Sequence, residues 1–344
     1  MIRPTFILAL SLALAASVAA PCSAAAKAAK KKPLRPEVRE FIEITARDFP
    51  VDARQLEKLL AQAVTKQSIL DAISRPAERV VPWYEYRERF MTEKRIREGV
   101  DFWSANATYL TAIADDGIAA AVAGICGVET SFGRITGRFR VVDALYTLAF
   151  DFPPREAFFR SELQQFVLLA KEQKIDAKSA QGSYAGAMGM PQFMPSSYRN
   201  FAVDGNSDGH IDLWSSSADI IASVANYLRV HGWRNGEPVV ADASLQDPDL
   251  SRFDSSSAIA LNETVGSLRD KGVIFETTLA SDAPAMLIIL TGKDGPEYRV
   301  GFANFFVITR YNRSTLYANA VNDLGRAILG AVRLAEPVAP QESR

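Results

Sequence analysis

Residues 117–128, GIAAAVAGICGV, contain no charged side chain and carry β-branched residues at helical spacing. A helix that is apolar on every side lies in the interior of a protein, so this segment predicts a buried central helix. Glu129 follows it directly. Positions 118, 122, 125 and 129 share one helical face, because steps of four and three residues close nearly whole turns. The carboxyl group of Glu129 therefore extends a stripe formed by Ile118, Val122 and Ile125.

Burial decides what this carboxyl group can do. In apolar surroundings the neutral form is favoured, so the pKa of Glu129 should rise. A carboxylic acid that stays protonated near neutral pH is able to donate a proton to a leaving oxygen. The alternative is an ion pair with a nearby arginine, for which Arg134, Arg138 and Arg140 are available. Gly133 is the predicted C-terminal residue of the helix.

Composition excludes several classes of protein. The chain has 344 residues with 39 basic and 40 acidic side chains, and 48% of its residues are hydrophobic. Neither a disordered chain nor a basic nucleic-acid binder has this balance. Cys22 and Cys126 cannot form a disulfide framework, and we expect Cys126 to be a small buried hydrophobic residue. Two histidines are too few for a His-rich metal site, and they make a Ser–His–Asp triad improbable.

The N-terminus has the pattern of an export signal. Arg3 precedes an apolar run, and small residues follow it, which predicts a signal peptide over residues 1–26 that is cleaved from a periplasmic protein. Cys22 offers an alternative, a lipoprotein anchored at that cysteine, although Pro21 fits this poorly. Residues 27–36 are charged and contain proline, and we interpret them as a solvated linker.

The periodicity of the remaining chain predicts a mainly α protein with a small β-rich inserted subdomain. Apolar residues recur every three or four positions in the N-terminal part and again near the C-terminus. Between these parts, a segment rich in Asp, Ser, Gly and Pro contains strand-like runs at 285–290 and 298–302. The predicted organisation is a helical catalytic region at 37–238, a β-rich insertion at 239–303, a helical return to the core at 304–335, and a tail at 336–344.

The segment 182–198, GSYAGAMGMPQFMPSSY, carries no charge at all. A solvated loop usually carries charges, so this pattern favours a packed loop that lines a cleft. Its polar side chains Ser183, Tyr184 and Gln192 suit a carbohydrate better than a phosphate group or nucleic acid. A tight loop with a purely structural role is the alternative.

Residues 204–215 have the spacing of an EF-hand calcium loop. Asp204, Asn206, Asp208, His210 and Asp212 occupy positions 1, 3, 5, 7 and 9, and His210 would contribute its backbone carbonyl. Gly209 stands at the turn position 6. Ser215 stands at position 12, where a bidentate acid is expected. The alternative is an Asp/Asn/Gly turn that binds nothing.

Several segments together resemble the membrane-bound lytic murein transglycosylase B family. They are GVETSFGRITGRFRVVDALYTLAFDFP, GSYAGAMGMPQFMPSSY, DGHIDLW, SVANYLRVHGW and FVITRYNRSTLYANAV. The resemblance runs from about Pro82 to Leu329. It implies a lysozyme-like helical fold and non-hydrolytic cleavage of peptidoglycan between N-acetylmuramic acid and N-acetylglucosamine, which leaves a 1,6-anhydro ring on muramic acid. It also implies a calcium site at 204–215.

The resemblance implies a role for particular residues. Glu129 matches the single catalytic acid/base, and Ser183 matches a serine near the substrate's N-acetyl group. Residues that match sugar contacts are Gln192, Tyr86, Tyr227, Asn304 and Tyr311. Arg155 matches the second of two adjacent arginines; the first is Pro154 here, which puts part of that contact in doubt. Met190-Pro191 replaces the more usual Tyr-Gly, which would alter a sugar subsite.

A site with one carboxylate constrains the mechanism, because ordinary glycosidases use two. Asp143, Asp151, Glu156 and Glu162 are predicted to be surface or ion-pairing groups, which leaves Glu129 alone. The substrate's acetamido oxygen and its 6-hydroxyl would then replace the second carboxylate and water. No cofactor is required for this chemistry, and calcium would be structural. The expected partners are glycan strands and proteins of cell-wall synthesis or hydrolysis, not nucleic acid.

Two other functions remain as alternatives. A non-catalytic peptidoglycan-binding or scaffolding protein would hold glycan without cutting it, but such a protein has no need of a buried acid. A calcium-responsive signalling protein is disfavoured by a single loop with a weakened twelfth position in an exported chain.

Overall fold

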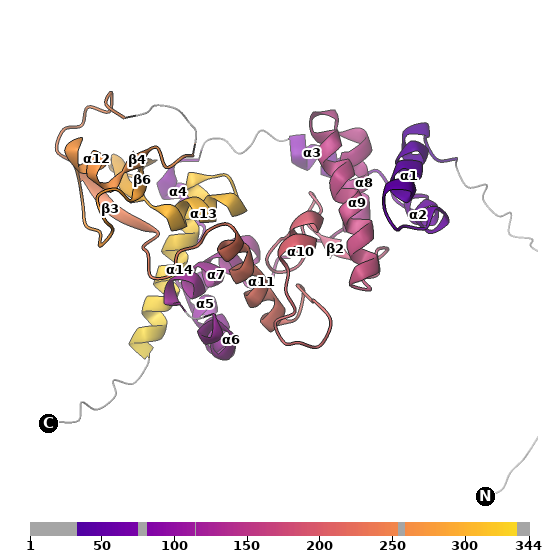
Figure 1. The fold of residues 1–344 in the computed structure, drawn as a ribbon, viewed down its shortest axis with the longest axis horizontal. Helices are drawn as coiled ribbons and strands as arrows, with labels where there is room; N and C mark the ends of the chain where they lie inside the picture. The colour runs from indigo at the N-terminus through magenta and orange to yellow at the C-terminus, as the bar shows by residue number, and fades with distance from the viewer. Residues whose placement is uncertain (1–32, 75–80, 114, 254–258, 336–344) are drawn as a thin grey trace, which may run out of the picture. The chain divides into compact units, whose positions relative to one another are not determined.

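The computed structural model of the chain describes residues 33–74, 81–113, 115–253 and 259–335 (Figure 1). The chain divides into a short first unit, Met1–Leu34, and a second unit, Arg35–Arg344, to which the following description applies. The predicted signal peptide with Cys22, most of the linker and the tail lie outside the described residues. Among the described residues, no helix has the length and apolarity that a membrane span requires.

Helices account for most of the second unit. Their bounds are α1 Pro36–Asp48, α2 Ala53–Leu60, α3 Gln67–Ser74, α4 Trp83–Glu88, α5 Glu93–Ala105, α6 Ala107–Ala112, α7 Asp116–Thr130, α8 Val141–Asp151, the 3-10 turn η1 Pro153–Arg155, α9 Glu156–Glu172, α10 Pro195–Phe201, α11 Ser217–Val230, α12 Val265–Asp270, α13 Ala303–Tyr311 and α14 Thr315–Ala335. The strands are β1 Phe139–Arg140, β2 Gln181–Gly182, β3 Val240–Leu245, β4 Glu263–Thr264, β5 Val273–Phe275, β6 Pro284–Thr291 and β7 Pro296–Gly301. The predicted mainly helical class with a small sheet is confirmed.

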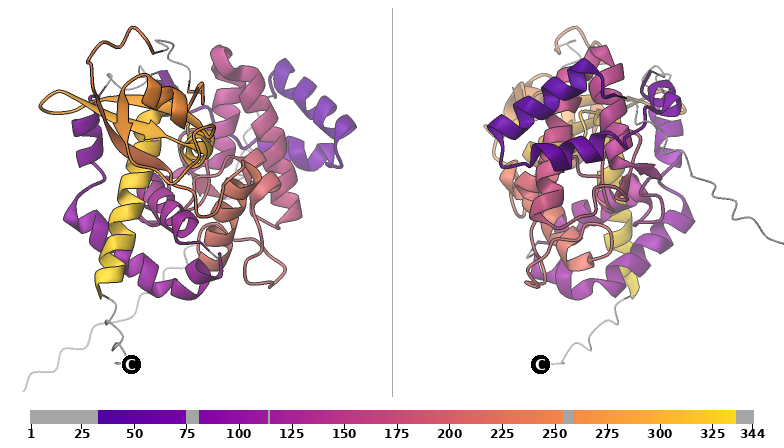
Figure 2. Two further views of the ribbon diagram at one scale, coloured as in Figure 1. Left: turned by 60° about the vertical axis from the view of Figure 1, so that its left-hand side comes forward. Right: turned by 90° about the vertical axis from the view of Figure 1, so that its right-hand side faces the viewer.

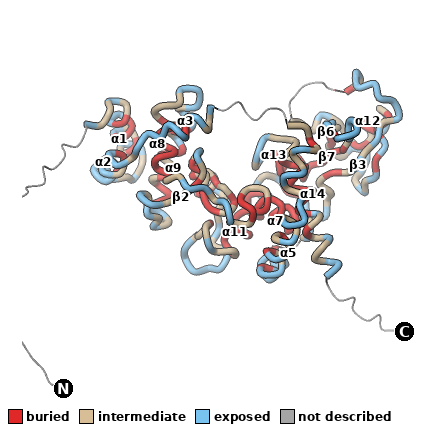
Figure 3. The backbone as a smooth tube through the Cα atoms, turned by 180° about the vertical axis from the view of Figure 1, so that it is seen from behind, coloured by how far each residue is buried: buried red, intermediate tan, exposed pale blue. Residues whose placement is uncertain are grey.

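Helix α7 is the predicted buried helix. It is covered by α5, α11 and, most extensively, α14, and its residues from Ile118 to Gly127 are all buried (Figure 3). Cys126 is among them as a free, buried thiol, as predicted. The Asp115 carboxylate accepts a hydrogen bond from the Gly117 backbone N–H at 2.9 Å and so begins the helix.

Helices α7 and α14 cross with their backbones in contact (Figure 2). A methyl group on Gly124 would lie 2.3 Å from the carbonyl oxygen of Val321, and one on Gly325 would lie 2.2 Å from that of Ala120. The pairing of 120 with 325 and 124 with 321 makes the two helices antiparallel. The crossing therefore brings the C-terminal end of α7 to the first turn of α14.

The end of α7 differs from the prediction. Ser131, rather than Gly133, is the first residue to leave the helical conformation, and Ser131, Phe132 and Gly133 all have positive φ, at 54°, 57° and 81°. Left-handed backbone costs a non-glycine residue about 1–2 kcal/mol, so surrounding contacts must hold it. The Thr130 hydroxyl provides two of them, because it accepts from Gly133 N at 3.0 Å and donates to Met190 O at 2.9 Å.

The antiparallel sheet has the strand order β4-β6-β7-β3-β5 and lies between α11 and α13 in the sequence (Figure 1). The strand-like runs at 285–290 and 298–302 fall mostly within β6 and β7. One face packs with α12 around Val265, Leu268, Val300 and Phe302. All of these strands lie within the segment 239–303.

The other face of the sheet is tied to the helices by Arg299 of β7, which is 9% exposed. Its guanidinium donates to Asp323 at 2.8 and 3.1 Å and to Asn319 at 2.8 Å, both on α14, and lies over the ring of Trp83 on α4. Burial alone raises the pKa of Asp323, but Arg299 and Arg87 outweigh burial and hold that pKa below its usual value. One buried cation thus joins β7, α4 and α14.

Candidate active site

Glu129 lies in the last turn of α7 and is half-buried. Burial raises its pKa to about 7, while a hydrogen bond from the Tyr317 hydroxyl to its Oε1, 2.7 Å long, acts in the opposite direction. Of the three arginines considered as ion-pair partners, Arg134 pairs with Glu98 and Arg140 with Asp143, and none of the three contributes to the shifted pKa of Glu129. Glu129 is therefore placed as a carboxylic acid with a near-neutral pKa and partial access to solvent.

Tyr317 was not predicted as a site residue. It is buried in the first turn of α14, and the antiparallel crossing with α7 carries its hydroxyl to Glu129. Burial, reinforced by the charge of Glu129, raises its pKa well above the usual range. Tyr317 is thus a permanent hydrogen-bond donor. Its motif, STLYANAV, was recognised in the sequence, but no local signal there points to a contact with Glu129.

Two further tyrosines pack behind this pair. The Tyr311 ring stacks parallel to that of Tyr317 with 6.5 Å between centroids, and its hydroxyl donates to Pro191 O at 2.5 Å. Tyr227 packs edge-on against Tyr311 at 4.8 Å and donates to Arg310 O at 2.7 Å. Tyr227 is only 7% exposed, so its hydroxyl supports the wall of the site more than it offers a contact to a ligand.

The uncharged loop 182–194 is held against the turn that follows Glu129. The Gln192 side-chain nitrogen donates to Thr136 O at 3.1 Å and to Gly189 O at 2.9 Å. Both amide hydrogens are therefore used, and only the Gln192 side-chain oxygen remains to accept a bond from a ligand. Together with the Thr130–Met190 bond, these contacts fix the distance between the loop and the acid.

Ser183 begins this loop. Its hydroxyl oxygen accepts from Ala185 N at 3.2 Å and Ala187 N at 3.1 Å. In the part of the chain that the structure describes, this hydroxyl donates to no protein group, so its proton is available to a ligand. Ser183 is half-buried, which fits such a contact.

The remaining predicted sugar contacts are placed differently. Tyr86 of α4 is half-buried, and it contributes to the raised pKa of Tyr317, so it lies near the residue that bonds to the acid. Arg155 is exposed in η1, with its guanidinium 4.3 Å from the ring centre of Phe158. Within the described part of the chain, the guanidinium of Arg155 lies over the rings of Phe158 and Phe159 and not beside Glu129.

Asn304 is held by the backbone that leads into β3. It is fully buried, and its side chain accepts from Arg234 N at 2.8 Å and donates to Arg234 O at 2.8 Å and Glu237 O at 2.9 Å. All the amide hydrogens are consumed by the backbone that leads into β3. These bonds tie Asn304 to the backbone, and the predicted sugar contact stays a prediction.

Other carboxylates do not join Glu129. Asp143, Asp151 and Glu156 form ion pairs with Arg140, Arg35 and Arg160, as predicted. Glu162 is an exception: it is 3% exposed and accepts from the backbone N–H and hydroxyl of Ser196, where it begins α10.

The EF-hand-like loop has its side chains turned to its own backbone. Asp204 accepts from Asp208 N and Gly209 N, Asn206 from Asp208 N, and Asp208 from His210 N. Asp212 accepts from Trp214 N and Ser215 N. Among the described residues, no three His, Cys, Asp or Glu side chains converge as a metal site. The donors are oxygen ligands of the kind calcium prefers, and each carboxylate keeps lone pairs beyond those used by its backbone bonds.

Asp219 anchors this loop and was not predicted. It is buried in α11, and its carboxylate accepts from Gly205 N and Asp212 N, both at 2.8 Å. The loop is therefore ordered by a protein carboxylate that lies outside the EF-hand spacing.

Comparison with known proteins gives a consistent result. Residues 34–326 match the family model described as the transglycosylase SLT domain. Membrane-bound lytic murein transglycosylase B of Escherichia coli (strain K12) is 38% identical over 304 residues, 85% of this chain and 82% of that protein. Soluble lytic transglycosylase SltB1 from Pseudomonas aeruginosa is 49% identical, with a TM-score of 0.82 over 87% of this chain and 100% of that chain.

Two solved complexes extend this comparison. Escherichia coli lytic transglycosylase Slt35, in complex with calcium, is 37% identical with a TM-score of 0.78 over 87% of this chain and 94% of that chain. SltB3 from Pseudomonas aeruginosa, in complex with NAG-anhNAM-pentapeptide, is 29% identical with a TM-score of 0.75 over 86% of this chain and 79% of that chain.

Proposed function

Because the chain belongs to the transglycosylase SLT domain family, we propose that Glu129 is the sole acid/base with which it cleaves glycan strands. The chain is a lytic transglycosylase that acts on peptidoglycan and needs no cofactor. The observation that carries the role of Glu129 is its near-neutral pKa, set by burial against the Tyr317 hydrogen bond.

The proposed reaction proceeds in two proton transfers. With Tyr317 bonded to Oε1, the acidic proton resides on Oε2 of Glu129 and passes to the glycosidic oxygen as the bond to the anomeric carbon breaks. The substrate's acetamido oxygen stabilises the positive carbon. The resulting carboxylate takes the proton of the muramic acid 6-hydroxyl, whose oxygen bonds to the anomeric carbon. Glu129 ends protonated, and no water is consumed.

Positioning groups support this sequence. The available proton of Ser183 is suited to hold the acetamido group, and the side-chain oxygen of Gln192 is suited to accept from a sugar hydroxyl. Tethering the nucleophile within the substrate replaces a bound water, since intramolecular attack carries a large effective concentration. We also propose Tyr86 and Tyr311 as contacts near the acid, and Arg155 as a more distant contact.

The test is digestion of purified sacculi followed by mass analysis of the soluble products. We expect muropeptides that are one water lighter than hydrolysis products. Reducible muramic acid ends would indicate a hydrolase, and no release of soluble material would favour the alternative of a binding or scaffolding protein.

We further propose that the chain acts outside the cytoplasm. A cleaved signal peptide at 1–26 would release it into the periplasm, and lipid attachment at Cys22 is the alternative, which the membrane-bound Escherichia coli relative makes relevant. Cell fractionation of the wild type and Cys22→Ala separates these outcomes, because only an anchored protein would leave the membrane fraction on substitution.

A further inference from the structure

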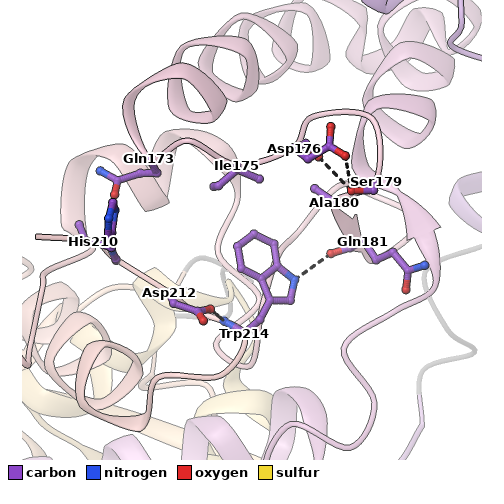
Figure 4. Close-up of a pocket in the computed structure, with 10 residues that line it drawn as sticks. Gln173, Ile175, Asp176, Ser179, Ala180, Gln181, His210, Asp212 and Trp214 are labelled. Atoms are coloured by element: carbon purple, nitrogen blue, oxygen red, sulfur yellow. Dashed lines mark hydrogen bonds between the residues drawn. The ribbon is translucent and has the colours of Figure 1, made fainter. Parts of the chain in front are cut away.

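A cavity of about 420 Å³ lies between the C-terminal end of α9, strand β2 and the segment that precedes α11 (Figure 4). Ile175, Ala180 and the indole of Trp214 form its apolar interior, and Gln173, Asp176 and Asp212 lie at its edge. None of the residues placed around Glu129 lines this cavity, so it is separate from the candidate active site.

The Trp214 ring is held in one orientation. Its Nε1 donates to Gln181 O of β2 at 3.1 Å, and its backbone N–H donates to Asp212 at 2.7 Å. The ring of Tyr198 supports it at 6.1 Å between centroids. In Figure 4 the indole projects into the space below Ile175, beside Ala180 and Gln181. The cavity therefore has a preformed aromatic wall.

The edge of the cavity disfavours an anion and offers partners for a hydroxyl-bearing ligand. Two carboxylates disfavour an anion. The same carboxylates already accept bonds within their own turns, Asp176 from Lys178 N and the Ser179 hydroxyl, and Asp212 from Trp214 N and Ser215 N. Each carboxylate keeps lone pairs that can accept from the hydroxyls of a ligand. Gln173 accepts from Ile211 N at 3.3 Å, which leaves its amide hydrogens as donors.

We propose that the Trp214 pocket is an accessory saccharide subsite that holds the glycan strand away from Glu129. A sugar ring has apolar C–H faces that pack on an indole and hydroxyls that reach the polar edge. Strand β2 connects the two sites, because Gln181 precedes Ser183 by two residues, about 7 Å of extended chain. This inference rests on the proposed function, in which Ser183 contacts the same glycan strand.

Binding is tested directly with triacetylchitotriose, a neutral saccharide without muramic acid or peptide. Tryptophan emission is followed in the wild type, in Trp214→Phe and in the control Trp103→Phe, which alters a half-buried tryptophan on α5. We expect a saturable change in the wild type and the control that is absent from Trp214→Phe. No change in the wild type, or a change that persists in Trp214→Phe, would overturn the proposal.

Kinetics give a second, independent readout. Trp214→Ala removes the aromatic wall, whereas Ala180→Gln fills the cavity and keeps the Trp214 hydrogen bond, which guards against a folding defect. Both should lower kcat/KM on long glycan strands about 3- to 10-fold, the range for one aromatic contact, and leave a tetrasaccharide substrate unaffected. Equal losses on both substrates, or no loss on long strands, would contradict a remote subsite. If the wild type released no anhydro product, the proposed function would fail, while the titration would still test the pocket.

Discussion

The Tyr317 hydroxyl donates a 2.7 Å hydrogen bond to Glu129 Oε1 across 188 residues of sequence. Burial makes the carboxylic acid weaker, and this bond makes it stronger, so the pKa of Glu129 settles at about 7. A lone residue that must first give a proton and then take one back works best with a pKa near the operating pH. The hydrogen bond from Tyr317 together with burial thus gives Glu129 a near-neutral pKa without a second carboxylate.

Glu129→Gln tests the central assignment. The amide keeps the shape of the side chain and accepts a bond from Tyr317, but it cannot supply a proton. We expect turnover on sacculi to fall by about 10²- to 10⁴-fold or more, since no other acid is placed to substitute. Release of anhydromuropeptides is the assay, and circular dichroism checks the fold. A folded variant that keeps more than about a tenth of wild-type turnover would show that another group is the acid.

Tyr317→Phe should move the pH profile. Without the hydroxyl, the ionised form of Glu129 loses a partner, so its pKa rises above about 7. Because the protonated acid starts the reaction, the alkaline limb of kcat/KM should shift to higher pH by about one unit, the difference between a charged and a neutral hydrogen bond. Tyr311→Phe is the control, since its hydroxyl donates to Pro191 instead. An unmoved limb in Tyr317→Phe would contradict the coupling.

The same pKa predicts a pH-dependent stability difference between the wild type and Glu129→Gln. Glu129 titrates at about 7 in the folded protein and at about 4.3 in the unfolded chain, so folding favours its protonated form. Its stabilising contribution is complete below pH 4.3 and is lost as the pH rises to 7. From pH 5 to pH 8, urea denaturation should show the variant gaining up to about 2.5 kcal/mol relative to the wild type. A constant difference would mean that Glu129 has an ordinary pKa.

Calcium should stabilise the protein weakly. The loop 204–215 offers carboxylate oxygens in EF-hand order, but Ser215 replaces the bidentate acid, so we expect a Kd of about 10⁻⁴–10⁻³ M. At 10 mM calcium this affinity adds about 1.4–2.7 kcal/mol to the free energy of unfolding, measured as a rise in Tm. Magnesium is the ion control. A rise that is absent, or that survives Asp204→Ala combined with Asp208→Ala, would show that the loop is only a turn.

Arg299→Met should destabilise the fold strongly. It leaves the buried Asp323 carboxylate with Arg87 as its remaining cationic partner. Removing one partner of a buried pair typically costs about 3–5 kcal/mol, and we expect a loss near the lower end because Arg87 stays. Arg333→Met is the matched control, because the Arg333–Asp116 pair is exposed and should be worth no more than about 1 kcal/mol. Urea denaturation compares the two. Similar losses in both variants would mean that burial of Arg299 does not matter.

Local patterns predicted the parts of the site that depend on one segment. The uncharged helical run 117–128 predicted that α7 is buried and on which face of that helix Glu129 lies. The composition of 239–303 predicted the strands. The run 285–290, AMLIIL, lies within β6, because a short continuous apolar run is typical of a buried strand.

Contacts between distant segments were not accessible in this way. Tyr317 reaches Glu129 only through the crossing of α7 and α14, and the Asn304 amide is bonded to backbone 70 residues earlier in the chain. Glu162, expected to be a surface or ion-pairing group, is buried because its helix packs against α10. The charge of a side chain in the sequence does not reveal whether a backbone N–H from a distant segment will donate a hydrogen bond to it.

The glycine crossing of α7 and α14 sets the reach of the active-site hydrogen bond. Gly124 contacts Val321. Val321 lies about one turn from Tyr317 on α14, and Gly124 lies just over one turn from Glu129 on α7. The distance between the helix axes at this contact therefore determines how far apart the Tyr317 and Glu129 side chains lie. A single methyl group added to Gly124 would push α7 and α14 apart and lengthen the distance between Tyr317 and Glu129. The absence of side chains at Gly124 and Gly325, which lie at the helix crossing and not in the candidate active site, therefore sets the geometry of the catalytic acid.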